Sequence, residues 1–431
     1  MKKYKLGELI EVSRGASLKG DFYAASGKYI RLTCGNFDYR NNSFKENTSK
    51  DNLFYIGEFK AEFLLEKGDL ITPLTEQAIG LLGSTAWIPE SGKYIQSQDI
   101  AKITCKEELL DKKFAYYLIS SNMVKQQLSA AAQQTKIRHT SPDKIKDCTV
   151  WLPSLEEQKQ IGQLLFDLDR KIELNRAINH NLEAMAKQFY DYWFVQFDFP
   201  DKNGKPYKSS GGKMVWNEKL KREIPEDWKV TQLGNLCSFR NGINYAKDEI
   251  GEPYAIVNVR NISATSILLD GEDFDVITIP LSKATNYILT EKDIVIARSG
   301  CPGSTRLLHT SNKTLFCGFI ICCTPIEEYL RNYITLFLKI LEGSSATTSG
   351  GSILQNVSQD TLKSLWIILP SIKLLMIFDR FLKDLIDLLY SNSMAIKILT
   401  KQRDELLPLL MNGQVKVGVE RSRLNYDLSN G

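Results

Sequence analysis

Two stretches of the chain place apolar residues at alternating steps of four and three, the heptad pattern of a helix that packs against another helix. The first stretch covers residues 161–193 and the second covers residues 378–410. Equivalent positions lie 217 residues apart, as Leu168 and Leu385 do. Because each apolar seam has to be buried, we predict that the two helices pair with each other through such positions.

A polar residue interrupts each seam at the same place, Asn175 in the first helix and Asn392 in the second. A buried asparagine lowers the stability of a helix pair but fixes its register, because only one alignment lets the two amides meet. We therefore predict that Asn175 and Asn392 pair across the helices. The alternative is that both are ordinary surface residues.

The duplication continues upstream of both helices. Segment 141–154 aligns with segment 358–371, and both end in Leu-Pro-Ser, where proline is typical of a helix start. Short β-rich segments and loops rich in Gly, Asn and Ser come before each copy. The segments of the first copy are Tyr29–Thr33, Leu70–Thr72, Ala86–Ile88 and Ile100–Ile103, with a helix predicted at 112–128 and its counterpart at 331–341. The predicted fold class is α+β, with two similar modules and two long helices.

A polar connector rich in Gly and Pro, residues 199–213, follows the first helix. We expect it to carry the chain back along that helix, so that the helices pack antiparallel and the modules lie at opposite ends. The predicted parts are a first module at 1–152, a helix at 153–198, a linker at 199–227, a second module at 228–369, a helix at 370–413 and a tail at 414–431.

Composition narrows the function classes. The 431 residues carry a net charge of +4, so any surface that binds nucleic acid has to concentrate its positive charge on one face. Neither a membrane span nor a signal peptide is apparent, which predicts a cytoplasmic protein with no membrane partner. The eight cysteines form no C-x-x-C pair, which indicates reduced core thiols, and the apolar run Phe316–Cys323 predicts a buried strand.

Catalytic motifs are nearly absent. There is no phosphate-binding loop, no dinucleotide fingerprint and no nucleophile elbow. Asp143 with Glu157 and Lys159 formally matches a metal-dependent nuclease motif, but the second copy has Leu374 and Met376 in place of the last two. We predict no catalytic residue and no metal site, and keep a metal-dependent nuclease as an alternative.

Equivalent loops of the two modules carry unlike polar residues of the types that contact base edges and phosphates. The loops before the Leu-Pro-Ser strands share an apolar anchor, Ile137 or Leu354, but differ in their polar residues. Glycines in the other loops would let a ligand approach the backbone. The candidate DNA-binding residues are Arg14, Lys19, Gln77, Gln134, Lys136, Arg138 and His139 in the first module, and Arg240, Asn241, Asn244, Arg298, Ser299, Gln355 and Asn356 in the second. For any one of them, a solvated loop position is the alternative.

The duplicated layout, the segment Leu152–Gln158 and the stretch from Phe199 through Trp228 together resemble the specificity subunit of a type I restriction–modification system. The resemblance covers nearly the whole chain. It implies two target-recognition domains that each read one half of a split site on double-stranded DNA, and a conserved antiparallel coiled coil that docks methyltransferase subunits. A restriction and translocase subunit would join them, and S-adenosylmethionine, ATP and Mg²⁺ would bind those partners and not this chain.

One departure from the family pattern affects the second helix. Leu374 and Leu375 stand where the family has a Glu-Gln pair such as Glu157 and Gln158, so we expect an altered docking surface at that end. The main alternative function is a bivalent scaffold that holds two protein partners and does not bind DNA.

Overall fold

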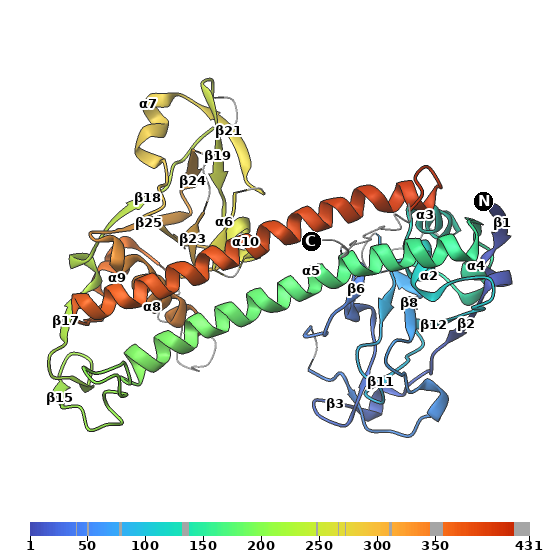
Figure 1. The fold of residues 1–431 in the computed structure, drawn as a ribbon, viewed down its shortest axis with the longest axis horizontal. Helices are drawn as coiled ribbons and strands as arrows, with labels where there is room; N and C mark the ends of the chain where they lie inside the picture. The colour runs from blue at the N-terminus through green and yellow to red at the C-terminus, as the bar shows by residue number, and fades with distance from the viewer. Residues whose placement is uncertain are drawn as a thin grey trace, which may run out of the picture. The chain divides into compact units, whose positions relative to one another are not determined.

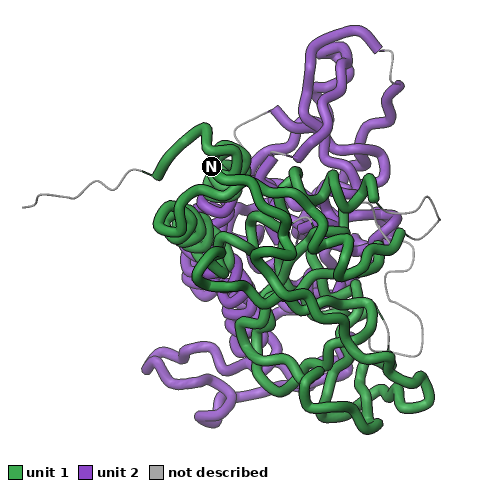
Figure 2. The backbone as a smooth tube through the Cα atoms, turned by 90° about the vertical axis from the view of Figure 1, so that its right-hand side faces the viewer, with its two compact units in different colours: residues 1–173, 397–431 green, residues 174–396 purple. Residues whose placement is uncertain are grey.

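The computed structural model describes residues 1–417 apart from 40, 50, 77–79, 132–137, 247–248, 266, 272, 310–312 and 345–356. The chain divides into two compact units (Figure 2). Unit 1 comprises residues 1–173 and 397–431, and unit 2 comprises residues 174–396. Each unit therefore contains one module together with one part of each long helix.

The long helices are α5 (Leu155–Tyr190) and α10 (Ile372–Met411), the green and red helices of Figure 1. A serine precedes each of them: Ser154 Oγ accepts from the Glu157 N–H at 3.3 Å, and Ser371 Oγ accepts from the Leu374 N–H at 3.4 Å. Such caps satisfy amide groups that the first helical turn leaves unpaired. A π-helical turn at Asp191–Val195 ends the first helix near the predicted position.

Within unit 2 the two helices pack antiparallel. Asn179 contacts Ser393, and further along α5 the ring of Phe189 lies 4.2 Å from that of Phe381, so one number rises as the other falls. Leu385 is buried in the core of this unit, whereas Leu168, which belongs to unit 1, is half-buried. The predicted α+β fold with an antiparallel helix pair is confirmed.

The predicted amide pair between Asn175 and Asn392 is wrong. Asn179 Nδ2 donates instead to Ser393 Oγ at 3.1 Å, and Asn392 Nδ2 is buried without a hydrogen-bond partner among the described residues. In an antiparallel pair, equivalent positions of the two copies oppose each other only at the midpoint of the pairing. The contact between Asn179 and Ser393 puts that midpoint near Ala177. The two equivalent asparagines lie on opposite sides of this midpoint and therefore do not face each other.

The main sheets of the two modules repeat one strand order. In unit 1 the order is β10-β8-β12-β2, and in unit 2 the order β23-β22-β25-β18 corresponds to it, with β20 added at the edge next to β23. The strands are β2 (Ile10–Arg14), β8 (Leu70–Pro73), β10 (Ala86–Trp87), β12 (Ile100–Cys105), β18 (Cys237–Asn241), β20 (Leu268–Leu269), β22 (Ile294–Ala297), β23 (Thr305–Leu308) and β25 (Ile320–Pro325). The duplication seen in the sequence is therefore a duplication of the fold.

Smaller elements complete each module. A second sheet has the order β11-β4-β7-β3 in unit 1 and β21-β19-β24 in unit 2. These strands are β11 (Tyr94–Ile95), β4 (Tyr29–Arg31), β7 (Phe54–Tyr55), β3 (Tyr23–Ala24), β21 (Asp275–Ile279), β19 (Glu252–Val257) and β24 (Thr314–Phe316). The pair β1 (Lys2–Lys5) and β14 (Thr149–Leu152) precedes α5, and the pair β17 (Lys229–Gln232) and β26 (Trp366–Leu369) precedes α10. Module helices are α2 (Lys112–Ile119), α3 (Asn122–Ala131), α4 (Pro142–Lys146), α6 (Val259–Ala264), α8 (Arg331–Ser344) and α9 (Gln359–Ser364).

The connector after α5 is folded onto unit 2 and is not the simple polar return that the sequence predicts. The ring of Phe199 stacks on those of Tyr207 and Trp228, with centroids 4.7 and 4.8 Å apart. A hairpin of β15 (Met214–Asn217) and β16 (Arg222–Pro225) follows, and Arg222 Nη2 donates to the Val195 carbonyl at 2.6 Å. Aromatic stacking thus builds this segment into the core at the end of α5.

Candidate nucleic-acid interface

The strand register identifies equivalent positions at the ends of β2 and β18. Arg14 pairs with Ala101 on β12, and Asn241 pairs with Ile321 on β25. Both Arg14 and Asn241 are exposed, and each directly precedes a glycine. Two of the predicted DNA-binding residues therefore occupy the same place in the two modules.

At each of these glycines, the end of the strand lies directly against another backbone segment of the same module. The Ala16 N–H donates to the Gln96 carbonyl at 2.9 Å, and the Ile243 N–H donates to the Phe316 carbonyl at 2.9 Å. A Cβ atom on Gly15 or Gly242 would collide with carbonyl oxygens of these facing segments. The predicted role of these glycines, close approach of a ligand, is therefore wrong, because the space is filled by backbone.

In the first module, polar side chains gather beside Arg14, and we call Arg14, Thr75, Gln98, Asp99 and His139 tip 1. Arg14 Nε donates to the Gln98 carbonyl at 2.8 Å, and Thr75 Oγ1 donates to Asp99 Oδ1 at 3.1 Å. His139, on β13 (Arg138–His139), places Nδ1 3.4 Å from Thr75 Oγ1. Gln98 and His139 are exposed. Tip 1 thus offers a cation, a carboxylate, an amide and an imidazole, groups that form hydrogen bonds to base edges.

The corresponding surface of the second module is partly apolar, and we call Asn241, Asn244, Arg298, Ser299 and Phe319 tip 2. All five are exposed, Phe319 to 63%. The Arg298 N–H donates to the Phe319 carbonyl at 2.9 Å, and a side chain at Gly318 would collide with Asn244 Oδ1, so these residues adjoin.

Turn geometry shows that Phe319 takes the place of Asp99. The Ile100 N–H donates to the Ser97 carbonyl at 3.0 Å, and the Ile320 N–H donates to the Cys317 carbonyl at 2.9 Å. Phe319 and Asp99 therefore hold the same position in equivalent turns. The predicted single buried strand over 316–323 is wrong, because β24 ends at Phe316 and this turn separates it from β25.

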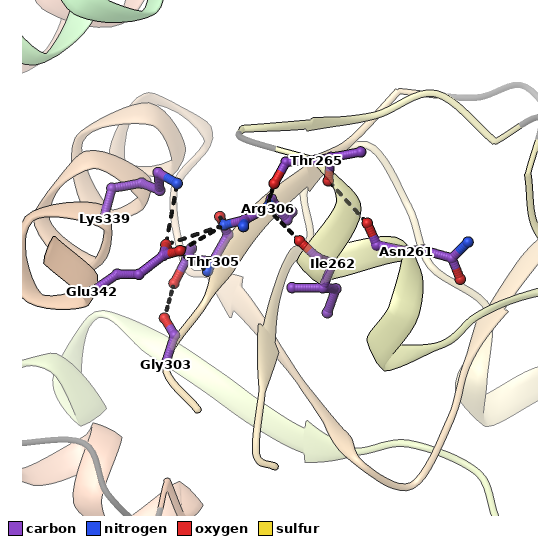
Figure 3. A network of polar contacts seen from close by, with 8 residues as sticks. All are labelled: Asn261, Ile262, Thr265, Gly303, Thr305, Arg306, Lys339 and Glu342. Carbon is purple, nitrogen blue, oxygen red and sulfur yellow. Dashed lines mark hydrogen bonds and ion pairs between the residues drawn. The ribbon is translucent and has the colours of Figure 1, made fainter. Parts of the chain in front are cut away.

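A buried arginine, Arg306, holds together a polar network at the start of β23 (Figure 3). Arg306, 4% exposed, donates from Nε to the carbonyls of Ile262 and Thr265 at 3.0 and 2.8 Å, and its Nη1 lies 3.1 Å from Glu342 Oε2 on α8. The neighbouring Thr305 donates from Oγ1 to the Gly303 carbonyl at 3.0 Å. This network fixes the turn between β22 and β23, which carries Arg298 and Ser299.

Two residues predicted to contact DNA, Arg240 and Arg138, already have partners within the chain, and their contact with DNA stays a prediction. Arg240 Nη2 donates to Asp293 Oδ2 at 2.8 Å and to the Ile288 carbonyl at 3.0 Å, so this guanidinium belongs to the scaffold. Arg138 donates to Ser129 Oγ at 2.9 Å and pairs with Glu76 at 3.6 Å. The Arg240 side chain is 35% exposed, and Asn241, the next residue of the strand, points to the opposite face.

The remaining predictions lie elsewhere. Lys19 is exposed and precedes the short 3₁₀ turn Gly20–Phe22. Gln77, Gln134, Lys136, Gln355 and Asn356 fall outside the described residues, as do Ile137 and Leu354. Sequence reasoning missed Thr75, Gln98, Asp99 and Phe319; the glycine next to Phe319, inside an apolar run, was the signal for a turn there.

Of the Glu-Gln pair at the start of α5, the glutamine faces the protein interior and the glutamate bonds to the serine that caps the helix. Gln158 is 2% exposed; its Nε2 donates to the Leu109 carbonyl at 3.1 Å, and its Oε1 accepts from the Asp111 N–H at 3.0 Å. Leu375, its counterpart, is fully buried in the core of unit 2. At this position a buried hydrogen-bonding side chain is replaced by a core leucine, and the altered docking surface expected at the start of α10 stays a prediction.

Glu157, the glutamate of the nuclease motif, takes part in the cap of α5. Glu157 Oε2 accepts from the Ser154 N–H at 3.1 Å and from Ser154 Oγ at 2.9 Å, and these bonds lower the pKa of the Glu157 carboxyl. In the part of the chain that the structure describes, no group of three or more His, Cys, Asp or Glu side chains could hold a metal ion. Over the same residues, no helix has the length and apolar character needed to cross a membrane.

Comparison with known proteins identifies the family. The sequence pattern described as "Type I restriction modification DNA specificity domain" matches residues 1–184 and 225–392. The chain is 24% identical to the type I restriction enzyme MjaIX specificity subunit of Methanocaldococcus jannaschii, over 70% of this chain and 69% of that protein. It is 22% identical to the HindI specificity subunit of Haemophilus influenzae, over 96% and 99% of the two chains.

A solved structure shares the fold. The crystal structure of the type I restriction–modification system S subunit from M. genitalium superposes with a TM-score of 0.59 and 16% identity, covering 95% of both chains. The matched pattern spans both modules, most of α5 and about half of α10. The chain therefore belongs to the type I restriction–modification DNA specificity family.

Proposed function

We propose that the chain recognises double-stranded DNA at two separate half-sites, one for each module, as the specificity subunit of a type I restriction–modification complex. The observation that carries this proposal is the pair of equivalent tips. The strand frame is the same in both modules, yet Asp99 in tip 1 is replaced by Phe319 in tip 2. Two modules with the same strand arrangement but different side chains at their tips are suited to reading two different short sequences.

The long helices are the proposed docking surface for methyltransferase subunits. Several large apolar side chains on them remain exposed in this chain: Leu174 and Met185 on α5, and Ile372, Met376, Ile377, Leu388 and Ile398 on α10. Exposed apolar side chains in such number along two paired helices favour a protein partner. We assign no catalytic role to the chain; S-adenosylmethionine, ATP and Mg²⁺ would be bound by the methyltransferase and restriction subunits.

Selection of duplexes from a randomised pool tests the DNA proposal. Full-length chain, alone and with its methyltransferase subunits, should enrich two short specific sequences separated by an unspecified gap of fixed length. Enrichment of one continuous sequence, or of none, would contradict the proposal. In a genome that encodes the complex, sequencing of methylated adenines should show the same split motif.

A salt titration separates DNA recognition from the scaffold alternative. Phosphate contacts release counterions, so the logarithm of the DNA affinity should fall linearly with the logarithm of salt concentration. A bivalent protein scaffold would bind duplex DNA weakly at every salt concentration, and its apolar interfaces would respond little to salt.

A further inference from the structure

A shielded polar triad joins the first module to both long helices within unit 1. Asp169 on α5 accepts from Tyr117 Oη through Oδ2 at 2.6 Å and from Arg403 Nη1 through Oδ1 at 2.9 Å. Tyr117 lies on α2 and Arg403 lies on α10, and these two residues are 3% and 9% exposed. Burial, and then the adjacent Asp169 carboxylate, raise the pKa of Tyr117, so its hydroxyl stays protonated as a donor.

The same three positions of the duplication are apolar in unit 2. The counterparts of Asp169 and Arg403, 217 positions away, are Ile386 and Ala186. The counterpart of Tyr117 on α8 is Leu336, because Lys113 lies against Gly162 as Asn332 lies against Asp379. All three are buried, and all belong to one hydrophobic cluster of unit 2. The duplicated chain therefore has one polar and one apolar version of a single contact between module, α5 and α10.

This difference determines which residues would face each other if a long helix paired with the same helix of a second molecule. If two copies of α5 paired in the present register, each Asp169 would face the Ala186 of the other copy and lose Arg403. If two copies of α10 paired, each Arg403 would face Ile386. Asp169 would then keep only Tyr117, and Arg403 would keep only Asp404, 2.8 Å away. Loss of the ion pair between the two helices is destabilising, whereas an apolar contact tolerates either partner.

We propose that the triad Tyr117–Asp169–Arg403 selects the partner of each long helix, so that α5 accepts α10 and rejects a second copy of α5. A pair of like halves would carry two identical modules. The selection therefore keeps tip 1 and tip 2 in one particle, and it holds whether or not the tips bind DNA.

Native mass spectrometry of a nicked full-length chain tests this selection. A protease site is inserted after Asn203, in an exposed turn of the connector, and the folded protein is cut there. The apolar variant Tyr117→Leu, Asp169→Ile, Arg403→Ala gives the first contact the residues of the second. After incubation at low concentration, wild type should retain pairs of unlike halves. The apolar variant should raise the ratio of like to unlike pairs by about a hundredfold.

Two further variants keep the test decisive. Asn332→Ala removes a 2.9 Å hydrogen bond to Asp379 that lies inside the second half, and this control should produce no like pairs. If the apolar variant does not fold, Asp169→Arg alone should produce like pairs, and Asp169→Arg with Arg403→Asp should suppress them again. Like pairs in wild type at the level of the variants, or none after Asp169→Arg, would overturn the proposal. Loss of DNA binding changes none of these outcomes.

Discussion

Gln158 on α5 donates from Nε2 to the carbonyl oxygen of Leu109, at 3.1 Å, and so ties the start of the helix to the loop that precedes α2. In the second copy Leu375 fills the equivalent place with an apolar side chain, and the tie is made instead by Asn332 on α8, which donates to Asp379 Oδ1 at 2.9 Å. The two helix starts are thus held to their modules by different residues.

Replacing Gln158 by Leu should lower the free energy of unfolding by about 1–3 kcal/mol, because the Leu109 carbonyl and the Asp111 N–H would lose their buried partner. Denaturant unfolding measures this loss. Glu156→Lys is the matched control: Glu156 is exposed, its counterpart is Lys373, and the change should leave stability within about 0.5 kcal/mol. Equal stability of Gln158→Leu and wild type would show that the tie contributes nothing.

Arg298 and Arg240 should differ in their effects, although both were candidates for DNA contact. Arg298→Ala should weaken binding to all duplexes and reduce the salt slope by about one, because an exposed guanidinium contacts a phosphate. Arg240→Ala should instead lower the free energy of unfolding by about 2–3 kcal/mol, since buried Asp293 loses a charged partner. Salt-dependent binding isotherms and thermal unfolding of both variants distinguish these outcomes.

Phe319 should contribute an apolar contact to one half-site only. Phe319→Ala should weaken binding about tenfold, within the range of roughly 1–3 kcal/mol for aromatic contacts to bases, and leave the other half-site preference intact. The control is Val276→Ala, which removes another exposed apolar side chain of the same module, 67% exposed on β21. If Phe319 contacts a thymine methyl, uracil-substituted duplexes should weaken wild type and not the variant.

The lengths of α5 and α10 should set the gap between the half-sites. Seven residues added to each helix lengthen it by about 10 Å, or about three base pairs of duplex. Selection from a randomised pool should then return both half-sites unchanged with a gap about three base pairs longer. An unchanged gap would mean that the helices do not act as the spacer.

Much of the architecture could be predicted from the sequence, because duplicated apolar patterns are a direct record of duplicated cores. The long helices and the strand β8 come from such patterns, and each appears within a few residues of its predicted place. The asparagine pair failed because a heptad pattern does not give the register of an antiparallel pair. The helix predicted over 112–128 is broken at Ser120, where α2 ends and α3 soon begins.

The candidate interface was less predictable, because polar residues follow no period. Asn241 and Arg298, predicted from paired loops, are exposed, whereas Arg240, next to Asn241, bonds to Asp293 within its own module. Phe319 was missed because an aromatic residue in an apolar run is normally a core residue. Only the turn between β24 and β25 exposes it.

The glycine contacts have a consequence for mutational screens of this protein. Any side chain at Gly15 or Gly242 would push the strand end away from the segment facing it and displace the recognition surface as a whole. Such substitutions would abolish sequence discrimination and so imitate the loss of a base contact, although neither glycine has a side chain with which to read a base. A screen that scores only discrimination between DNA sequences would therefore assign the contact to the glycine and not to the proposed DNA-binding residue that precedes it on the strand.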